Sequence, residues 1–317
     1  MTLFSFILTF ISVFLHAGWN FISKACNCTV AFYTLSNVVA AIMLLPAFII
    51  SPLPLGKLDF SFFIFFAGSV VFEILYSLGL IGAYKKGDIS SVYPMVRALP
   101  VIMIAIISIS FRLGATPNIF AIIGFGLVTL GCFILPQAKL SSINIKCFTN
   151  KAIFPILLAA IGTTGYTLCD SLALKVLSKQ MPVTAISTVA SYFFLVECGL
   201  SIGLGLFIFN AQEISNLKNN CIKSIYPYLT GIFSCLAYLL ILFAMSFATN
   251  VAYIQAFRQM SLPIGVAMGV IFLKEKLSAC RLTGITIIFI GLLLTVIKDD
   301  LYSQIVHFIK GLIQQIF

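Results

Sequence analysis

The sequence predicts an all-α integral membrane protein with ten transmembrane helices, arranged as two inverted repeats of five helices each. The prediction rests on composition, on the length of the apolar runs and on a similarity between the two halves. Hydrophobic residues make up 61% of the 317 positions and charged residues only 9%, with a mean hydropathy of +1.13. A soluble domain is usually about a quarter charged. So few charges cannot cover a water-facing surface, and lipid must therefore surround most of the chain.

The apolar runs are long enough to be membrane-spanning helices. Backbone in contact with lipid must be hydrogen-bonded internally, so a span is either a helix or a strand of a closed barrel. Barrel strands have about 10 residues of alternating polarity, whereas these runs are longer and do not alternate. In the first half the expected spans are 2–22, 31–50, 60–84, 89–111 and 118–135, and in the second half they are 152–174, 183–209, 226–247, 252–273 and 282–297.

The runs divide the chain into two repeats, a linker and a tail. The first repeat covers residues 1–135, a polar linker follows over 136–151, and the second repeat covers 152–297. The tail, 298–317, has apolar residues at helical spacing. We expect it to be an amphipathic helix, lying either in the membrane interface or against the end of the bundle. The first run lacks a basic leading region and a cleavage site, so we interpret it as a span and not as a signal peptide.

The two halves resemble each other around an arginine and a proline. The segment Tyr93–Pro100 parallels Gln255–Pro263, and each is followed by an apolar run and a glycine-punctuated helix. The glycines match with the same seven-residue spacing, Gly124 and Gly131 against Gly284 and Gly291. Two units with an odd number of spans face opposite ways in the membrane. Such inverted repeats are typical of secondary transporters, whose binding site lies near the midplane.

Charged side chains within the spans indicate where that site lies. A charge at the bilayer centre costs at least ~2.5–3.5 kcal/mol, so it needs a partner or a wet cavity. The charged residues in the expected spans are Glu73, Arg97, Asp170, Glu197 and Arg258. The two arginines are at equivalent points of the repeat and would suit a carboxylate or phosphate, which arginine binds with two hydrogen bonds. Alternatively, Arg97 pairs permanently with Glu73 or extends to the interface.

The three carboxylic acids and the neighbouring prolines have two interpretations each. Glu73, Asp170 and Glu197 could exchange protons during a coupled transport cycle, or one could simply neutralise an arginine. The prolines beside the arginines are Pro94, Pro100 and Pro263. They predict broken helices at matching points of the two halves, which is typical of a binding site, although a lipid-adapted bend is the alternative.

Two helices carry a polar stripe at four-residue spacing. The first span has Ser12, His16, Asn20 and Lys24, and the sixth has Thr163, Thr167, Ser171 and Lys175. Residues at this spacing share one helix face. The stripes could line a cavity or make helix–helix hydrogen bonds, each typically worth ~0.6–2 kcal/mol. His16 could relay protons near neutral pH or serve as a hydrogen-bonded packing residue.

Several of these motifs resemble one branch of the EamA-type transporters, in the drug/metabolite transporter superfamily. The segment His16–Lys24, HAGWNFISK, is similar to the H-A-x-W-N-x-x-x-K opening of that branch. Tyr93-Pro94 through Arg97 and Pro100 is similar to its Y-P-x-x-R-x-x-P stretch. Further similarities involve Tyr166-Thr167 with Asp170, then Phe257-Arg258 to Ser261, and Glu275.

The resemblance covers nearly the whole chain except the tail. It implies a bundle of ten helices in two inverted repeats that moves metabolites or drugs. One departure is Arg112, where the family often has a glutamate after the fourth helix; this puts the symmetry of the two halves in doubt there. From the motifs and stripes together we expect substrate-binding roles for His16, Trp19, Asn20, Tyr93, Arg97, Tyr166 and Arg258, and proton-coupling or charge-partner roles for Glu73, Asp170 and Glu197.

The leading functional hypothesis is a multi-pass secondary transporter of the inner cell membrane. It would move a small organic solute, amino-acid-like or anionic, by alternating access. Efflux of lipophilic cations is the alternative, with Glu73, Tyr76 and Tyr166 dominating through charge and cation–π contact. A membrane-embedded lipid-modifying enzyme is the alternative of another class, but no H-E-x-x-H or G-x-S-x-G motif supports it.

We expect neither a cofactor nor a metal ion, and no catalytic residues. The lone pair Cys26 and Cys28 has no second pair and no nearby histidine. The net charge of +10 comes mostly from loops between apolar runs, without a basic stripe interleaved with aromatics, so the expected partners are the solute and lipid but no nucleic acid. No P-loop is present, so a gradient or exchange would drive transport. The sequence leaves a homodimer open.

Loop charges and family resemblance give opposite orientations. With a cytoplasmic N-terminus, the cytoplasmic side would hold Lys57, Arg112, Lys175, Lys179, Lys298 and Lys310, and the other side Lys24, Lys85, Lys86, Lys139, Lys146, Lys151, Lys218, Lys223, Lys274, Lys276 and Arg281. The positive-inside rule therefore favours both ends outside, whereas the resemblance implies both ends inside. We follow the resemblance, because the charge bias is spread over many loops.

A reporter fused at Phe317 should give a cytoplasmic signal, and an external signal would contradict this orientation.

Overall fold

The chain folds as an all-helical bundle, as predicted. The computed structural model describes residues 2–25, 29–86, 89–137, 152–208, 211–274 and 277–297. Within these ranges every regular element is a helix or a short helical turn. Seven of the described helices are long and apolar enough to cross a membrane. Two shorter apolar helices accompany them, Pro94–Ser110 and Ile119–Ile134. These lengths support a multi-pass membrane protein.

The helices of the first half follow the apolar runs closely. They are α1 (Leu3–Ala25), α2 (Val30–Ile50), the turn η1 (Leu55–Lys57), α3 (Phe60–Lys86), α4 (Ile89–Ser110) and α5 (Ile119–Ile134). Side chains cap two of the helix starts. Thr29 accepts a hydrogen bond from the Phe32 backbone at the start of α2, and Asn118 accepts one from Ala121 at the start of α5. Such caps satisfy N–H groups that have no partner within the helix.

The second half departs from the apolar runs at two places. Its elements are α6 (Ile153–Leu177), α7 (Ile186–Gly205), α8 (Ala211–Asn216), the π-helical turn η3 (Leu217–Cys221), α9 (Tyr226–Met245), α10 (Val251–Phe257), the 3-10 turn η4 (Arg258–Met260), α11 (Ser261–Leu273) and α12 (Ala279–Val296). The short α8 and η3 were not anticipated, because their polar sequence lacks apolar periodicity. The single run expected over 252–273 is interrupted at η4.

The prolines beside the two arginines have different effects on their helices in the two halves. α4 continues through both Pro94 and Pro100, whereas the second half changes to a 3-10 turn around Arg258. Prolines are tolerated in membrane helices where neighbouring elements satisfy or cover the freed backbone groups. Pro263 lies in the first turn of α11, directly after the 3-10 turn, so the change of helix type lies beside a residue that has no N–H to donate. Matching helix breaks were expected, but only the second half has one.

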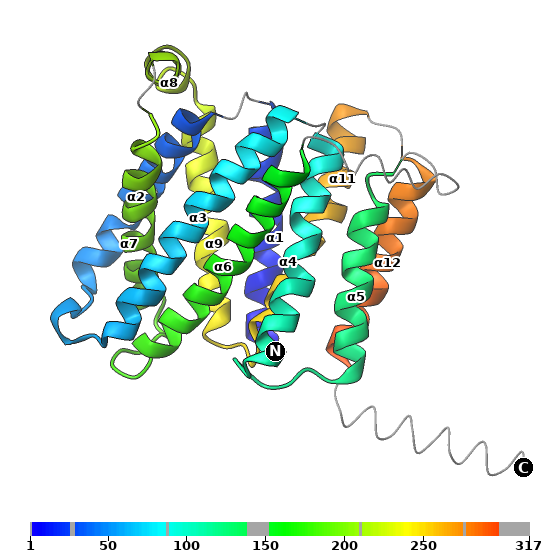
Figure 1. Cartoon of the computed structure of the whole chain (residues 1–317), viewed down its shortest axis with the longest axis horizontal. Coiled ribbons are helices and arrows are strands. Elements are labelled where there is room, and N and C mark those ends of the chain that lie inside the picture. Colours follow the sequence, from blue (N-terminus) through cyan, green and yellow to red (C-terminus); the bar gives the residue numbers. More distant parts are fainter. Residues whose placement is uncertain are drawn as a thin grey trace, which may run out of the picture.

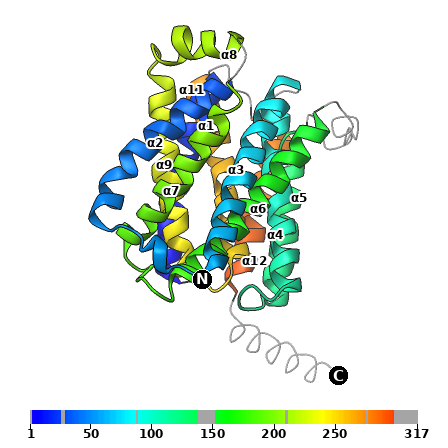
Figure 2. The same cartoon turned by 60° about the vertical axis from the view of Figure 1, so that its left-hand side comes forward.

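Helices from the two halves pack in pairs across the bundle. α5 lies against α12 along one side, and α2 lies against α7 along the other (Figure 1). Between them α3 packs against α6 and α1 packs against α9, an arrangement that can be followed in the turned view (Figure 2). Because every one of these pairs joins the first half to the second, the interior of the bundle is built from both halves.

Glycines allow α5 and α12 to approach backbone to backbone. A Cβ atom on Gly131 would lie 2.7 Å from the Gly284 carbonyl oxygen, and one on Gly284 would lie 2.9 Å from the Gly131 carbonyl oxygen. Seven residues along each helix, Gly124 and Gly291 face each other in the same way. A Cβ on Gly124 would lie 2.5 Å from the Gly291 carbonyl oxygen, and one on Gly291 would lie 2.8 Å from the Gly124 carbonyl oxygen. Small residues permit such close packing in membranes, where van der Waals contact replaces the hydrophobic effect. The four glycines therefore form the α5–α12 interface.

Glycines bring the helices of the α3–α6 pair together, and side-chain hydroxyl groups join the helices of the α1–α9 pair. At the α3–α6 crossing, a Cβ on Gly79 would lie 2.5 Å from the Ala159 nitrogen, and one on Gly162 would lie 2.5 Å from the Tyr76 nitrogen. At the α1–α9 crossing, Ser12 Oγ donates to the Ala237 carbonyl at 2.7 Å. Interhelical hydrogen bonds of this kind are among the main forces that join helices in lipid.

Replacing Gly131 with alanine should destabilise the bundle. The added Cβ would meet backbone atoms of α12, which cannot rotate away, so we expect overpacking to cost about 1–3 kcal/mol. The matched control is Gly126→Ala in the same helix, where a Cβ has nothing within 4 Å. Thermal unfolding in detergent should show a lower melting temperature for the first variant only. Equal melting temperatures would contradict this description of the interface.

Candidate functional site

A small cavity lies inside the bundle, with walls from both halves. Its volume is about 70 Å³, room for a few water molecules or a very small solute. The residues that line it are His16, Trp19, Tyr33, Ser36, Asn37, Glu73, Tyr76, Ser77, Tyr166, Phe193, Glu197, Leu200, Thr230, Ser234, Tyr238 and Arg258. They come from α1, α2, α3, α6, α7 and α9 and from η4. Polar and aromatic side chains dominate this list, although only 14% of the residues in the chain are aromatic and 61% are hydrophobic.

Two carboxyl groups line this cavity, and each has one oxygen without a hydrogen-bond partner. Glu73 is on α3 and Glu197 is on α7, and the Oε2 atom of each is buried and makes no hydrogen bond. Only 5% of the Glu197 side chain surface is exposed. A buried polar atom left unsatisfied costs about 1–3 kcal/mol, and more when it is charged. The two oxygens therefore favour a ligand, a proton or water that supplies the missing partner.

Arg258 brings a positive charge to the same cavity from η4. Its Nη1 donates to Gln255 Oε1 at 3.2 Å and its Nη2 donates to the Tyr166 hydroxyl at 3.4 Å. The guanidinium carbon lies 5.4 Å from the centre of the Tyr238 ring, a cation–π contact. Its Nε atom is buried and has no hydrogen-bond partner. The group is thus fixed by its neighbours and retains one free N–H.

Asp170 lies next to the cavity but is fully satisfied by the protein. Its Oδ1 accepts hydrogen bonds from Ser69 and, at 2.7 Å, from the Tyr192 hydroxyl, and its Oδ2 accepts one from Tyr238. The side chain is completely buried. Because Tyr238 both contacts Arg258 and donates to Asp170, this carboxylate positions the aromatic wall of the cavity. It does not line the cavity itself.

Arg97 lies behind Arg258 and joins α4 to the start of α11. Its Nη2 donates to the Arg258 carbonyl oxygen at 3.4 Å and to the Ser261 hydroxyl at 3.1 Å. The side chain is buried, with 2% of its surface exposed, and it is not among the residues that line the cavity. The two arginines expected at equivalent points are therefore neighbours, but only Arg258 reaches the cavity.

The polar stripe of α1 divides between two roles. His16 and Trp19 line the cavity, whereas Ser12 makes the hydrogen bond to α9 described above and Asn20 donates to the His16 carbonyl at 2.6 Å. The stripe of α6 does not line this cavity, and Thr163 donates to its own helix at Ala159. The alternatives of cavity lining and hydrogen bonding thus both apply, each to different residues.

Some of the expected site residues lie outside what the structure describes. These are the side chains of Lys24 and Tyr93, the residues Cys26–Cys28 and Glu275, the linker beyond Gln137 and the tail. Among the described residues, no group of three potential metal ligands comes together. The main lining residues that sequence reasoning missed are Thr230, Ser234 and Tyr238 on α9. They are spaced four apart, so the stripe pattern used for α1 could have identified them.

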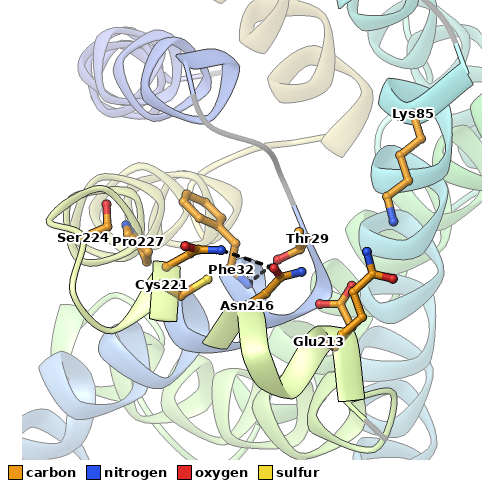
Figure 3. A pocket seen from close by; sticks show the side chains of 10 residues that line it. Thr29, Phe32, Lys85, Glu213, Asn216, Cys221, Ser224 and Pro227 are labelled. Atoms are coloured by element: carbon orange, nitrogen blue, oxygen red, sulfur yellow. Dashed lines mark hydrogen bonds between the residues drawn. The ribbon is translucent and has the colours of Figure 1, made fainter. Parts of the chain in front are cut away.

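A second, larger pocket lies at the end of the bundle covered by α8. Its volume is about 660 Å³, and its walls include Thr29, Phe32, Lys85, Gln212, Asn216, Asn220, Cys221, Ser224 and Pro227. Lys85 extends from α3 on the side opposite Ser224 and Pro227 (Figure 3). Glu213 holds α8 in place, since its Oε2 accepts a hydrogen bond from the Ala31 backbone at 3.1 Å. The two pockets share walls on α2, α3 and α9.

The opposite end of the bundle is tied by backbone contacts. The Ala115 nitrogen donates to the Thr249 carbonyl at 2.9 Å, and Asn250 Nδ2 donates to the Ala115 carbonyl at 3.1 Å. Gly114 lies so close to this segment that a Cβ on it would be 2.4 Å from the Thr249 carbonyl oxygen. Lys175 also donates to the Leu113 carbonyl. These contacts join the loop after α4 to the segment before α10.

Comparison with known proteins supports the fold alone. No family model matches the chain, and no curated protein matches it. Among solved structures, 28 chains match. One of them, described only as "Crystal structure of protein", has a TM-score of 0.66 over 92% of this chain and 97% of its own length, with 11% sequence identity. The bundle is therefore similar to a fold already seen in other proteins, at an identity too low to indicate function.

Removing the Asp170 carboxylate should destabilise the wall of the cavity. Asp170→Ala would leave three buried hydroxyls without their acceptor, so we expect the free energy of unfolding to fall by about 2 kcal/mol or more. Asp170→Asn keeps one acceptor oxygen and similar volume and should cost less. Thermal unfolding in detergent should rank the variants in that order, with Asp59→Asn, an exposed position at the start of α3, as control. An alanine variant as stable as the parent would contradict the role assigned to this network.

Proposed function

We propose that the protein is a secondary transporter that moves a small, amino-acid-like solute across the inner cell membrane by alternating access. The observation on which this depends is the central cavity, where unsatisfied carboxyl oxygens and unsatisfied N–H donors face the same small space. Intramembrane ionisable groups are costly and usually mark a pathway for ions or substrates. A solute with a cationic end and an acceptor end would complement both kinds of group.

The proposed architecture is a ten-helix bundle of two inverted repeats, as in the EamA-type transporters that the sequence motifs resemble. The reciprocal glycine contacts support it, because exchanging the halves converts the Gly124–Gly291 contact into the Gly284–Gly131 contact. The helix pairs follow the same symmetry, since exchanging the halves converts the α1–α9 pair into the α6–α3 pair. A two-fold arrangement of this kind would let one half rock against the other around a fixed site.

Charge balance in the cavity supports coupling to a gradient. When both are ionised, Glu73 and Glu197 together exceed the single guanidinium of Arg258, and an uncompensated charge is costly in a water-poor interior. A solute cation or a proton would restore the balance, so the carboxyl groups can accept either one in turn. Asp170 is unsuited to this exchange, because three hydroxyl donors already satisfy it.

Efflux of lipophilic cations is a second candidate that one observation favours. Glu73, Tyr76 and Tyr166 all line the cavity, and the Tyr76 and Tyr166 rings pack edge to face with their centroids 5.7 Å apart. Carboxylates with aromatic rings suit organic cations. The small volume of the cavity and the presence of Arg258 favour the amino-acid-like solute instead. A thermal-stabilisation screen with amino acids, carboxylic acids and organic cations would separate the two candidates.

Replacing the cavity glutamates should abolish transport. Glu73→Gln and Glu197→Gln remove the charge and leave the volume, so each should lower flux into proteoliposomes at least tenfold for any solute that stabilises the parent protein. Arg258→Gln should act similarly, since it removes the positive charge of the cavity.

The control is Asp59→Asn, which neutralises an exposed carboxylate at the start of α3 and should leave flux unchanged. Parental flux in all three cavity variants would overturn the proposed site. Absence of flux in the parent with every stabilising solute, under imposed proton and solute gradients, would overturn the transport function itself.

A further inference from the structure

The first helix holds a histidine and the chain's single tryptophan in contact at the cavity wall. Trp19 Nε1 donates a hydrogen bond to His16 Nδ1 at 3.0 Å. The two rings meet edge to face, with centroids 5.0 Å apart and an interplanar angle of 87°. Both side chains are buried, with 8% of His16 and 6% of Trp19 exposed, and both line the cavity.

This hydrogen bond determines where the imidazole carries its proton. The indole N–H is a donor only, so the nitrogen that it contacts must accept. In a neutral imidazole one nitrogen accepts and the other donates, and the hydrogen bond of one determines the state of the other. His16 is therefore held with its proton on Nε2. That Nε2 atom is buried and has no hydrogen-bond partner in the protein.

Other buried polar atoms that line the cavity are also without a hydrogen-bond partner, among them the Thr230 hydroxyl. Glu73 and Glu197 offer acceptors, and the only other buried cavity nitrogen without a partner among the described residues is Arg258 Nε. Neither carboxyl group forms a hydrogen bond with His16 within those residues. The donor is thus available to a group that enters from outside and that offers an oxygen acceptor.

We infer that Trp19 is a positioning residue, which holds His16 as a hydrogen-bond donor to an acceptor group of the solute. In this arrangement His16 selects solutes with a carboxylate or a similar oxygen acceptor at that end, and it is not the proton carrier of the cycle. The inference rests on the proposed function for its solute, but the state of the histidine can be measured without transport.

The first experiment measures the tautomer of His16 directly. The chain has two histidines, so His307→Gln leaves His16 as the only one, and its ring nitrogens can be observed by ¹⁵N NMR in detergent. We expect a single Nε2–H tautomer in the parent. Trp19→Phe keeps an aromatic ring but removes the donor and should give a mixture of tautomers. The matched control, Ser12→Ala, removes a hydrogen bond one turn earlier on α1 and should leave the tautomer unchanged.

The second experiment asks which chemical group reaches His16. Acetate, methylammonium and glycine serve as probes for an acceptor, a cation and a molecule with both. Acetate and glycine should shift the Nε2–H signal and change the fluorescence of Trp19, the only tryptophan. Methylammonium should leave the Nε2–H signal unchanged.

With a transported solute, Trp19→Phe should raise KM about threefold to tenfold with little change in kcat, as for one lost hydrogen bond. His16→Gln, which retains an N–H donor, should transport better than His16→Leu.

Three results would overturn the inference. The first is a proton on Nδ1 in the parent, or a tautomer unaffected by Trp19→Phe. The second is an Nε2–H signal that responds to methylammonium alone or to none of the probes. The third is equal KM values for the parent and Trp19→Phe. A parent protein that binds acetate or glycine at His16 but gives no flux would overturn the transport function and leave this inference intact.

Discussion

The cost of placing charged side chains in a bundle with little water constrains the whole interior of this protein. Asp170 meets this cost within the protein, through hydroxyl donors on three different helices. Glu73 and Glu197 do not, since each keeps one buried oxygen without a partner. In a low-dielectric interior that contrast separates a carboxylate that the fold satisfies from carboxyl groups that keep an unsatisfied oxygen at the cavity. The central cavity is therefore the place where the fold leaves carboxyl oxygens without a hydrogen-bond partner.

The scaffold around the cavity depends on close contact between helices of the two halves. Glycines bring α5 against α12 and α3 against α6 at backbone distance, and serines join α1 to α9. Lipid gives no hydrophobic drive for helix association, so packing and interhelical hydrogen bonds must supply it. Because these contacts all cross between the halves, any change in how the halves pack would also change the walls of the cavity.

The two ends of the bundle differ more than a symmetric repeat would require. At one end α8 and the π-helical turn η3 cover a polar pocket that shares three helices with the central cavity. At the other end the loop after α4 is tied by hydrogen bonds to the segment before α10. π-helical turns occur often at functional sites. The pocket under α8 is also the larger one, about 660 Å³ against about 180 Å³ for a pocket between Leu113, Lys175 and Asn250 at the other end.

Apolar run length and composition were enough to predict an all-helical membrane protein, because lipid permits few other structures. The same reasoning found Glu73, Glu197 and Arg258, since any charge inside a span must have a reason to be there. It could not distinguish Arg97, which contacts Arg258 and Ser261, from a residue that faces the cavity. Nor could it anticipate that Asp170 would be satisfied by tyrosines distant in sequence. Helical spacing determines which residues share a face, but only the packing of the helices decides what that face meets. That packing decides whether a buried polar atom finds a partner within the fold or keeps none.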